Sequence, residues 1–313
     1  MAKASVVIPV LNEEKKIENI IRQLLSQTVK PEIIIVDGGS TDNTLKIVKK
    51  YLKKFKNIKL YFEKGEVRSP ANAMNIGWRK AKGDIILFSG VDFIFEKQYI
   101  EKIIKEFDKN PKADVICFVS RPFIIRRFPS LLSKISFYRL LSHEKFELIA
   151  FRKGIYKRVG FFNPRLGFGE DRDLFKRIKE KFQVIKTKTL VKWSAYAFND
   201  FHEFFRRYLW YGRSIPRYLY KNPKDFGVLG YYLISISLIP SLILIVFSIK
   251  FVSLFLFFCS FPLLRGFFDG IKIWKNYKYL TPIFVLPFLE LSSAFIINLG
   301  FFQFLLGKRK VGR

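Results

Sequence analysis

Short apolar runs alternate with longer segments of helical periodicity in the first part of the chain. The run Val6–Val10 is too short for a core helix and is rich in β-branched residues, which is typical of a buried parallel strand. Apolar residues then recur at helical spacing from Ile17 to Leu25, which predicts an amphipathic helix, and Ile33–Val36 predicts a second strand. The pattern therefore predicts a βαβ unit at the start of the chain.

The alternation of strands and helices continues to residue 198. Further strands are expected at Ile58–Phe62, within residues 85–95 and at Ala113–Val119, and further helices at Leu45–Leu52, Ala71–Ala81, Lys97–Phe107 and from Glu170 or Asp171 onward. Alternating strands and helices form mostly parallel sheets with helices on both faces. We therefore predict a Rossmann-like α/β domain over residues 1–198.

An amphipathic segment follows at residues 199–226. It is crowded with aromatic and basic side chains, among them Arg206, Arg207, Trp210 and Arg213. A basic helix that carries tryptophan and has low net hydrophobicity tends to lie in the interface between membrane and water. We predict an interfacial helix in this segment.

Residues 227–313 have the composition of a membrane region. The segment Phe226–Ile249 carries no charge and is long enough to span the hydrocarbon core. A single helix over residues 227–264 would be about 57 Å long, nearly twice the hydrocarbon thickness. We therefore predict a hairpin of two spans that turns near Lys250, followed by transmembrane and juxtamembrane segments up to the C-terminus.

The last two segments of this region are less regular. Residues 266–279 set aromatic residues against Lys272, Lys275 and Lys278, which predicts another interfacial helix. Residues 279–307 are uncharged apart from Glu290, and Pro282 and Pro287 predict a broken or re-entrant piece. The number of spans in this last piece stays open.

The charge of the chain is strongly positive. There are 56 Lys and Arg residues against 26 Asp and Glu residues, a formal net charge of +30. Such a balance indicates anionic partners, namely nucleic acid, a phospholipid surface or phosphorylated substrates. No base-stacking or helix-turn-helix signature is present, which argues against nucleic acid.

The two ends of the chain indicate its orientation. The N-terminus enters a strand directly, without the apolar stretch and cleavage site of a signal peptide. The Lys-rich segment 266–279 and the basic tail GKRKVGR favour the cytoplasmic side, which implies an even number of spans. We therefore expect a multi-pass protein of the cell membrane whose α/β domain is cytoplasmic.

Carboxylates follow three of the predicted strands. Glu13 comes after the first strand, Asp37 ends the second, and Asp92 ends the fourth. Ligands of open α/β sheets bind in the crevice beyond the carboxyl ends of the strands, so these groups offer acceptors to a base or ribose. No P-loop and no G-x-G-x-x-G follows the first strand. Ordinary turn chemistry accounts for the DGGS sequence about equally well.

The pairing of PVLNEE with VDGGSTDNT resembles the opening of family 2 glycosyltransferases, which are inverting, nucleotide-sugar-dependent enzymes with the GT-A fold. The resemblance covers residues 4 to about 215 and implies a GT-A domain, which the interfacial and transmembrane helices predicted above would follow. It implies that Pro9, Leu11 and Glu13 line the nucleoside pocket. It also implies that Asp37 accepts a hydrogen bond from the base.

The segment NAMNIGWRKAKGDIILFSGVD resembles the next motif of this family, whose strand ends in D-x-D. By this match Asp92 is the second acid, which binds Mg²⁺ or Mn²⁺ at the donor diphosphate. Gly90 replaces the first acid, and the histidine that many relatives place near Trp193 is absent. These departures imply a weaker or differently built metal site, or a loss of activity.

The block LIAFRKGIYKRVGFFNPRLGFGEDRDLFKRIKEKF resembles the acceptor-side motif of the family. By this match Asp171 is the general base for the acceptor hydroxyl, and Glu170 neighbours the acceptor. If the acceptor is a phosphate, Asp171 only orients it. As a bare pattern, two acids at a helix N-terminus are favourable without any function.

The segment Tyr211-Gly212-Arg213 resembles membrane-attached members of the family. In the functional interpretation Arg207 or Arg213 binds the donor diphosphate or a lipid phosphate, and the alternative is anchoring to lipid headgroups.

Together these features predict a membrane-anchored inverting glycosyltransferase. It would move a sugar from a nucleotide-diphosphate-sugar to a lipid-linked acceptor, which is a polyprenyl phosphate or a lipid-linked glycan. The alternative is a catalytically impaired sugar-nucleotide or lipid-binding subunit. The sugar, the nucleotide and the oligomeric state stay open.

Overall fold

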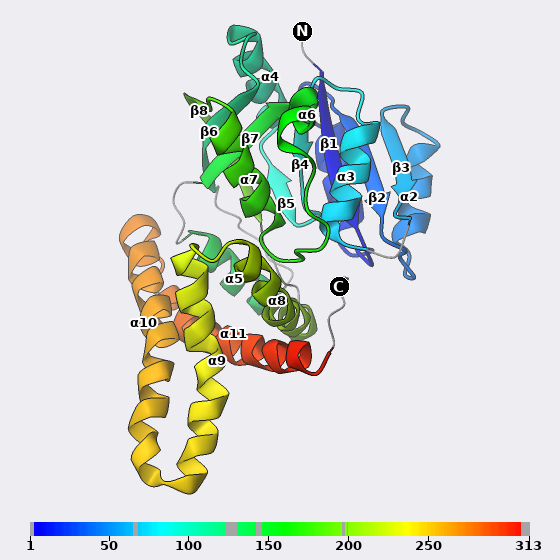
Figure 1. Cartoon of the computed structure of the whole chain (residues 1–313). Coiled ribbons are helices and arrows are strands. Elements are labelled where there is room, and N and C mark those ends of the chain that lie inside the picture. The colour runs from blue at the N-terminus through cyan, green and yellow to red at the C-terminus, as the bar shows by residue number, and fades with distance from the viewer. Residues whose placement is uncertain are drawn as a thin grey trace.

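A computed structural model describes residues 3–64, 68–122, 130–141, 146–195, 198 and 200–307 of the chain. Figure 1 shows an α/β domain, built from the N-terminal part of the chain, above a layer of helices from the C-terminal part. A hairpin of two helices extends from this layer away from the α/β domain.

The α/β domain is built on one sheet. Among the described residues it has the strand order β3-β2-β1-β4-β7-β6-β8-β5. The strands are β1 (Ala4–Val10), β2 (Glu32–Asp37), β3 (Ile58–Phe62), β4 (Ile85–Phe88), β5 (Phe93–Phe95), β6 (Val115–Pro122), β7 (Phe146–Arg152) and β8 (Ile185–Ala195). Strands β3, β2, β1 and β4 are parallel, β6 and β8 are parallel, and β7 runs antiparallel to both β4 and β6. The predicted mostly parallel sheet is confirmed.

Helices cover both faces of the sheet. Helices α1 (Ile17–Leu25), α2 (Thr44–Leu52) and α4 (Tyr99–Lys109) pack on one face. Helices α3 (Pro70–Lys80), α6 (Tyr156–Val159) and α7 (Glu170–Lys181) pack on the other. Alternate residues of β1 point to opposite faces, so Val6 and Ile8 belong to the first core and Val7 to the second. Both faces of the sheet are buried, which explains why the sequences of its strands are continuous apolar runs.

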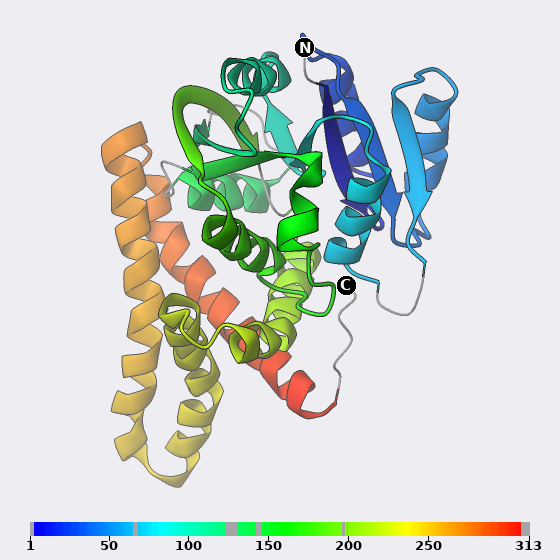
Figure 2. The ribbon, with the colours of Figure 1, turned by 45° about the horizontal axis from the view of Figure 1, so that its top comes forward.

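The helical layer consists of five helices among the described residues. They are α5 (Leu131–Leu141), α8 (Phe201–Lys221), α9 (Phe226–Phe247), α10 (Val252–Tyr277) and α11 (Thr281–Leu305). Helices α9 and α10 run side by side, and α11 crosses them and packs against α8. Figure 2 shows that α11 passes from the hairpin to the underside of the α/β domain. Helix α8 therefore lies between the α/β domain and α11.

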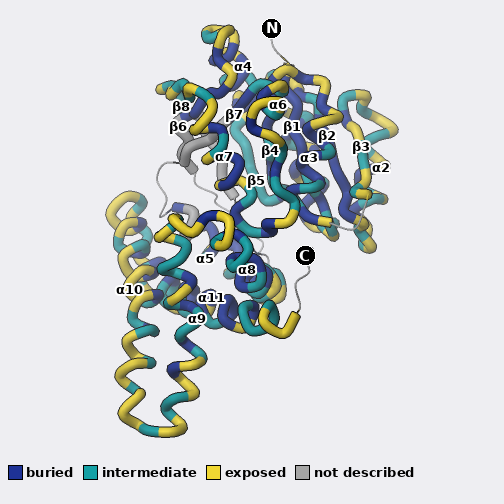
Figure 3. Tube along the Cα trace, viewed as in Figure 1, coloured by how far each residue is buried: buried dark blue, intermediate teal, exposed yellow. Residues whose placement is uncertain are grey.

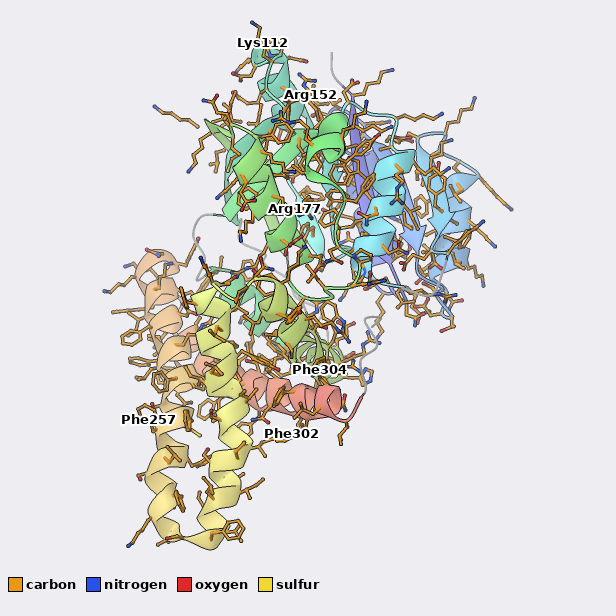
Figure 4. All side chains as sticks on the ribbon, viewed as in Figure 1. Lys112, Arg152, Arg177, Phe257, Phe302 and Phe304 are labelled. Atoms are coloured by element: carbon orange, nitrogen blue, oxygen red, sulfur yellow. The ribbon has the colours of Figure 1, made fainter. Side chains whose placement is uncertain are left out.

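The far half of the hairpin is exposed, as Figure 3 shows. Val246 is 84% exposed and Ile249 is 80% exposed at its tip. Phe257 points outward from α10 (Figure 4) and is 55% exposed. Helices α9 and α11, and the stretch Ile249–Tyr277 that contains α10, are each long and apolar enough to cross a membrane. Exposed apolar side chains over such helices indicate a lipid environment.

The predicted hairpin turn near Lys250 is confirmed, since a short 3₁₀ turn at Ile249–Phe251 joins α9 to α10. The prediction of a separate interfacial helix at residues 266–279 is wrong, because α10 continues unbroken to Tyr277. The prediction of a broken segment at residues 279–307 is also wrong, because α11 is one helix. Pro282 stands in its first turn, where no backbone donor is needed, and Pro287 is held by close packing against Gly266 of α10.

Candidate active site

A cavity of about 360 Å³ lies beyond the carboxyl ends of β1 and β2 and is closed on one side by α8. It is lined by Pro9, Val10, Leu11, Glu13, Lys16, Gly38, Gly39, Glu63, Arg68, Ser69, Pro70, Ala73, Gly90, Val91, Asp92 and Arg207. We call it the donor cavity. Five of the residues expected from the sequence line it, namely Pro9, Leu11, Glu13, Asp92 and Arg207. The position agrees with the crevice rule for parallel sheets.

Asp37 does not line the donor cavity but shapes its wall. Its carboxylate is 1% exposed and accepts hydrogen bonds from the backbone of Gly39 (2.8 Å) and Ser40 (3.0 Å) and from Ser40 Oγ (2.5 Å). Gly39 adopts a φ of +99°, and together with Gly38 it faces the cavity. Both carboxylate oxygens therefore hold the turn in place.

Glu63 and Arg68 are cavity residues that the sequence analysis missed. Glu63 accepts hydrogen bonds from the backbone of Ser69 (3.0 Å) and from Asn72 Nδ2 (2.9 Å), and burial raises the pKa of its carboxyl. Arg68 Nη1 lies 3.4 Å from the carbonyl oxygen of Gly38. Glu63 follows the end of β3, so the rule that selected Asp37 and Asp92 could also have selected it.

Asp92 uses space that the neighbouring glycine leaves open. A β-carbon on Gly90 would lie 2.4 Å from Asp92 Oδ1. An acid at position 90, as in D-x-D, would therefore displace this carboxylate. Among the described residues, no group of three or more His, Cys, Asp and Glu side chains could hold a metal ion. A single carboxylate suits Mg²⁺, which proteins often bind through one or two carboxylates, water and substrate phosphates.

Arg207 is the cation that α8 contributes to the donor cavity. Burial opposes its ionisation, but electrostatic interactions with Tyr211, Asp92 and Glu13 raise its pKa above the ordinary value overall. Its guanidinium carbon also lies 5.1 Å from the ring centroid of Phe198. The side chain is therefore a fixed positive charge at the wall of the cavity.

Arg213 lies elsewhere on the same helix. It does not line the donor cavity, burial lowers its pKa, and its Nε is buried without a hydrogen-bond partner. It is six positions after Arg207, which places the two side chains on different faces of α8. Of the two arginines named from the sequence, the structure brings only Arg207 to this cavity.

A buried ion pair fastens α8 to the α/β domain. Lys16 Nζ donates to Glu203 Oε2 at 3.0 Å, and the two side chains are 7% and 23% exposed. Lys16 precedes α1 and also lines the donor cavity, whereas Glu203 lies one turn before Arg207. The pair therefore joins the cavity wall to the helix that carries Arg207.

A second cavity, of about 510 Å³, adjoins the first and shares Pro9, Pro70 and Gly90 with it. It is lined by Pro9, Pro70, Met74, Phe88, Ser89, Gly90, Phe93, Tyr99, Phe151, Phe162, Glu170, Asp171, Arg172, Leu174, Phe175 and Ile178. We call it the acceptor cavity. Asp37, Asp92 and Asp171, to which the family resemblance gives roles at the site, therefore do not share one pocket, since Asp92 and Asp171 line adjoining cavities and Asp37 supports the wall of the first.

Asp171 stands in the first turn of α7. The helix follows Gly169, which adopts a φ of +72°, and Asp171 is exposed with Oδ1 accepting from the backbone N–H of Arg172 at 2.8 Å. Asp173 in the same turn is buried and pairs with Arg177 (2.8 Å) and Lys221 (2.7 Å). Figure 4 shows Arg177 within the α/β domain, well above the hairpin. Asp173 is thus structural, and Asp171 is the carboxylate open to a ligand.

Relatives of known sequence match the first part of the chain. An uncharacterised glycosyltransferase of Haemophilus influenzae is 36% identical over 103 residues, 33% of this chain and 41% of that protein. A dolichyl N-acetyl-alpha-D-glucosaminyl phosphate 3-beta-D-2,3-diacetamido-2,3-dideoxy-beta-D-glucuronosyltransferase of Methanococcus voltae is 34% identical over 115 residues, 35% of each chain. The chain therefore matches less than half of the length of these relatives.

Two solved structures share the fold. The mannosyltransferase PcManGT of Pyrobaculum calidifontis, in complex with GDP-Man and Mn²⁺, is 18% identical with a TM-score of 0.57, over 95% of this chain and 87% of that one. TarS 1-349 of S. aureus, in complex with UDP-GlcNAc, is 18% identical with a TM-score of 0.51, over 97% and 92%. The sheet domain therefore has the GT-A fold.

The model of the family described as "Glycosyl transferase family 2" matches residues 5–163, about half of the chain. This stretch contains β1 to β7 and the strand ends that line both cavities. The chain belongs to glycosyl transferase family 2.

Proposed function

We propose that this chain is a membrane-anchored inverting glycosyltransferase. It moves a sugar from a nucleotide-diphosphate-sugar donor to a lipid-linked acceptor at the cytoplasmic face of the cell membrane. The observation that carries the proposal is the pair of adjoining cavities, one with Asp92 and Arg207 and the other with Asp171. An in-line displacement needs the leaving diphosphate on one side of the sugar and the acceptor base on the other, and the shared wall allows that arrangement.

The donor occupies the donor cavity in this proposal. Pro9, Leu11 and Glu13 contact the nucleoside, and the turn that Asp37 holds places Gly38 and Gly39 beside it. The diphosphate faces Arg207, whose guanidinium stays charged and stabilises the negative charge of the leaving group. The neighbours PcManGT and TarS 1-349, in complex with GDP-Man and UDP-GlcNAc, support a nucleotide sugar as donor.

Asp92 would hold a Mg²⁺ or Mn²⁺ ion that shares its coordination with the diphosphate oxygens. When bound, such an ion supplies Lewis-acid stabilisation of the leaving group. The chain's own contribution is one carboxylate, placed in the space beside Gly90. PcManGT, whose structure contains Mn²⁺, supports this assignment.

Asp171 acts on the acceptor. We assign it the role of general base for a hydroxyl group in the acceptor cavity, with Glu170 beside the acceptor. The many apolar side chains of this cavity suit an amphipathic acceptor rather than a small polar one. The M. voltae relative, whose name describes a dolichyl phosphate-linked substrate, supports a lipid-linked acceptor.

In this proposal the hairpin attaches the enzyme to the membrane in which its acceptor lies. A lipid-linked acceptor stays in the bilayer, so an enzyme held at the same surface meets it at a high effective concentration. The Lys-rich end of α10 precedes α11 and the basic tail follows it, so both can face the cytoplasm if α11 lies along α8 rather than crossing the bilayer, which the close packing of α11 against α8 supports. Residues 1–198 form the catalytic domain in this proposal, and the later helices are its anchor.

A thermal-shift screen of UDP-, GDP- and dTDP-sugars with and without Mn²⁺ tests donor binding, since a ligand that binds only the native state raises the melting temperature. We expect at least one nucleotide sugar to stabilise the full chain. Release of its nucleoside diphosphate on addition of membrane extract then tests transfer. No stabilisation by any nucleotide sugar would contradict the proposal.

Gly90 in place of an acid favours a second candidate, a catalytically impaired binding subunit. Such a subunit would bind the nucleotide sugar in the same screen. It would release no nucleoside diphosphate with membrane extract, which separates the two candidates.

A further inference from the structure

A basic groove lies between α7 and the junction of α8 and α9. Its volume is about 840 Å³, and it is lined by Arg172, Phe175, Lys176, Lys179, Glu180, Tyr218, Asn222, Pro223, Lys224 and Asp225. We call it the basic groove. None of these residues has a role in the donor cavity.

The groove carries an excess of positive charge. Its lining holds four cations, Arg172, Lys176, Lys179 and Lys224, against the two carboxylates Glu180 and Asp225. Arg172, Lys176 and Lys179 stand at helical spacing, which places them on one face of α7. The groove therefore offers several donors and charges to one anion.

Asp225 offsets only one of these four positive charges, that of Arg172. It accepts hydrogen bonds from Tyr218 Oη at 2.7 Å and from Arg172 Nη1 at 2.9 Å. Burial opposes ionisation of Asp225, but these bonds and the charge of Arg172 hold its pKa below the ordinary value overall. Lys176 and Lys224 are exposed and line the groove, and Lys179 Nζ lies 4.0 Å from the ring centroid of Phe175 in the same groove.

The groove opens where the membrane hairpin begins. Asp225 caps α9 by accepting from the backbone N–H of Val228 at 3.2 Å. Phe226, the first residue of α9, is 74% exposed, and Tyr220 at the end of α8 is 93% exposed. Aromatic and basic side chains at the end of an apolar helix mark the headgroup level of a bilayer. The phosphate of a lipid would reach the groove at this level.

The groove also adjoins the acceptor cavity. Arg172 and Phe175 line both, and Arg172 directly follows Asp171. A ligand whose phosphate lies in the groove can therefore extend into the cavity that contains Asp171. Its lipid tail would leave along α9, past Phe226.

We propose that the basic groove binds the phosphate of the lipid-linked acceptor. The acceptor's sugar then extends past Arg172 into the acceptor cavity, so a lipid-linked glycan fits better than a bare polyprenyl phosphate. The proposal rests on the proposed function and adds to it a phosphate site on α7 and on the loop that leads into α9.

Binding of farnesyl phosphate to the purified full chain in detergent tests the site. We expect farnesyl phosphate to bind at least tenfold more tightly than farnesol, which has the same tail without the phosphate. The triple variant Lys176→Glu, Lys179→Glu and Lys224→Glu should lose at least tenfold in affinity for farnesyl phosphate. These side chains are exposed, so the melting temperature should stay close to that of the unchanged chain.

The matched control reverses three exposed lysines at the other end of the sheet, on α2 and just after it. Lys46→Glu, Lys49→Glu and Lys53→Glu change the net charge by the same amount. This variant should bind farnesyl phosphate as the unchanged chain does. Equal losses in the two triple variants would show that only the overall charge matters and would overturn the proposal.

Two competitors test whether the groove prefers a lipid-linked acceptor to free phosphate or to the headgroup of a phospholipid. Inorganic phosphate and dihexanoyl phosphatidylglycerol should each displace farnesyl phosphate only at concentrations at least tenfold higher. Equal competition by either one would overturn the acceptor assignment, because the groove would then serve as a general anion or headgroup site. Binding of nucleotide sugars is measured in parallel, and if it persists while farnesyl phosphate fails, this inference fails and the proposed function stands.

Discussion

Gly212 of α8 and Gly300 of α11 lie back to back where the two helices cross. A β-carbon on Gly212 would lie 2.9 Å from Cα of Gly300 and 2.0 Å from the carbonyl oxygen of Ile297. A β-carbon on Gly300 would lie 2.2 Å from the carbonyl oxygen of Leu209. The helix that brings Arg207 to the donor cavity is therefore held at backbone distance against α11, which is long and apolar enough to cross a membrane.

Gly212→Val should separate α8 from α11. The added side chain cannot enter the contact, and overpacking of this kind costs about 1–3 kcal/mol. We expect a lower melting temperature and weaker binding of the nucleotide sugar. Gly230→Ala is the matched control, because a β-carbon there meets nothing within 4 Å and alanine favours a helix. Similar melting temperatures for the two variants would contradict the close crossing.

Lys16→Met should destabilise the chain through loss of the buried pair with Glu203. The Glu203 side chain is 23% exposed and keeps an electrostatic interaction with Arg207, so we expect a cost of about 1–3 kcal/mol, below that of a fully buried pair. Lys105→Met removes an exposed pair with Glu101, whose side chains are 58% and 24% exposed, and should cost less than about 1 kcal/mol. Chemical denaturation measures both. The swapped variant Lys16→Glu with Glu203→Lys should recover part of the loss, and no recovery would argue against a direct pair.

Asp92→Ala should abolish the effect of Mn²⁺ on the stabilisation by the nucleotide sugar. Asp92 is the carboxylate that we assign to the ion, and Gly90 stands where the D-x-D pattern has its other acid. Asp84→Ala is the control, since Asp84 precedes β4 at the amino end of the strand. Thermal shifts with and without Mn²⁺ provide the measurement. An undiminished response to Mn²⁺ in Asp92→Ala would show that the metal assignment is wrong.

Asp171→Asn should reduce turnover while leaving the donor KM close to its original value. Loss of a general base typically lowers the rate about 10²–10⁴-fold, whereas the donor binds in the other cavity. Release of nucleoside diphosphate in the presence of acceptor measures the rate. Asp108→Asn, an exposed position on α4, is the control. A rate within about twofold of the original would assign Asp171 to orientation rather than to proton transfer.

Asp225→Asn should lower stability at neutral pH and lose this effect in acid. The pKa of Asp225 is below its ordinary value in the folded chain, so its ionised form stabilises the fold above the unfolded pKa of about 3.9. This contribution disappears as the pH falls through the folded pKa. The difference in melting temperature between the two chains should be constant from pH 5 to pH 8 and shrink below about pH 3.5. A difference that grows in acid would contradict the assignment.

Much of the α/β domain could be predicted from local patterns. Runs such as Val6–Val10 and Ile33–Val36 are buried on both faces of the sheet, so their apolar character marks them as parallel strands. The carboxyl ends of such strands meet at one edge whatever the details of packing. Glu13 and Asp92 could therefore be placed at a common crevice in advance, whereas Pro9 was expected there from the family resemblance.

The residues that distant segments bring to the site could not be predicted from local patterns. Arg207 and Arg213 are equivalent in sequence terms, and only the packing of α8 between the sheet and α11 brings Arg207 to the donor cavity. The prolines of α11 suggested a break, yet tertiary contacts with α10 keep the helix whole. Propensity and periodicity act over a few residues, whereas a cavity wall depends on contacts between segments far apart in the chain. Strand ends and the hairpin turn near Lys250 thus followed from local patterns, while the contact between α11 and the helix that carries Arg207 arose from long-range packing.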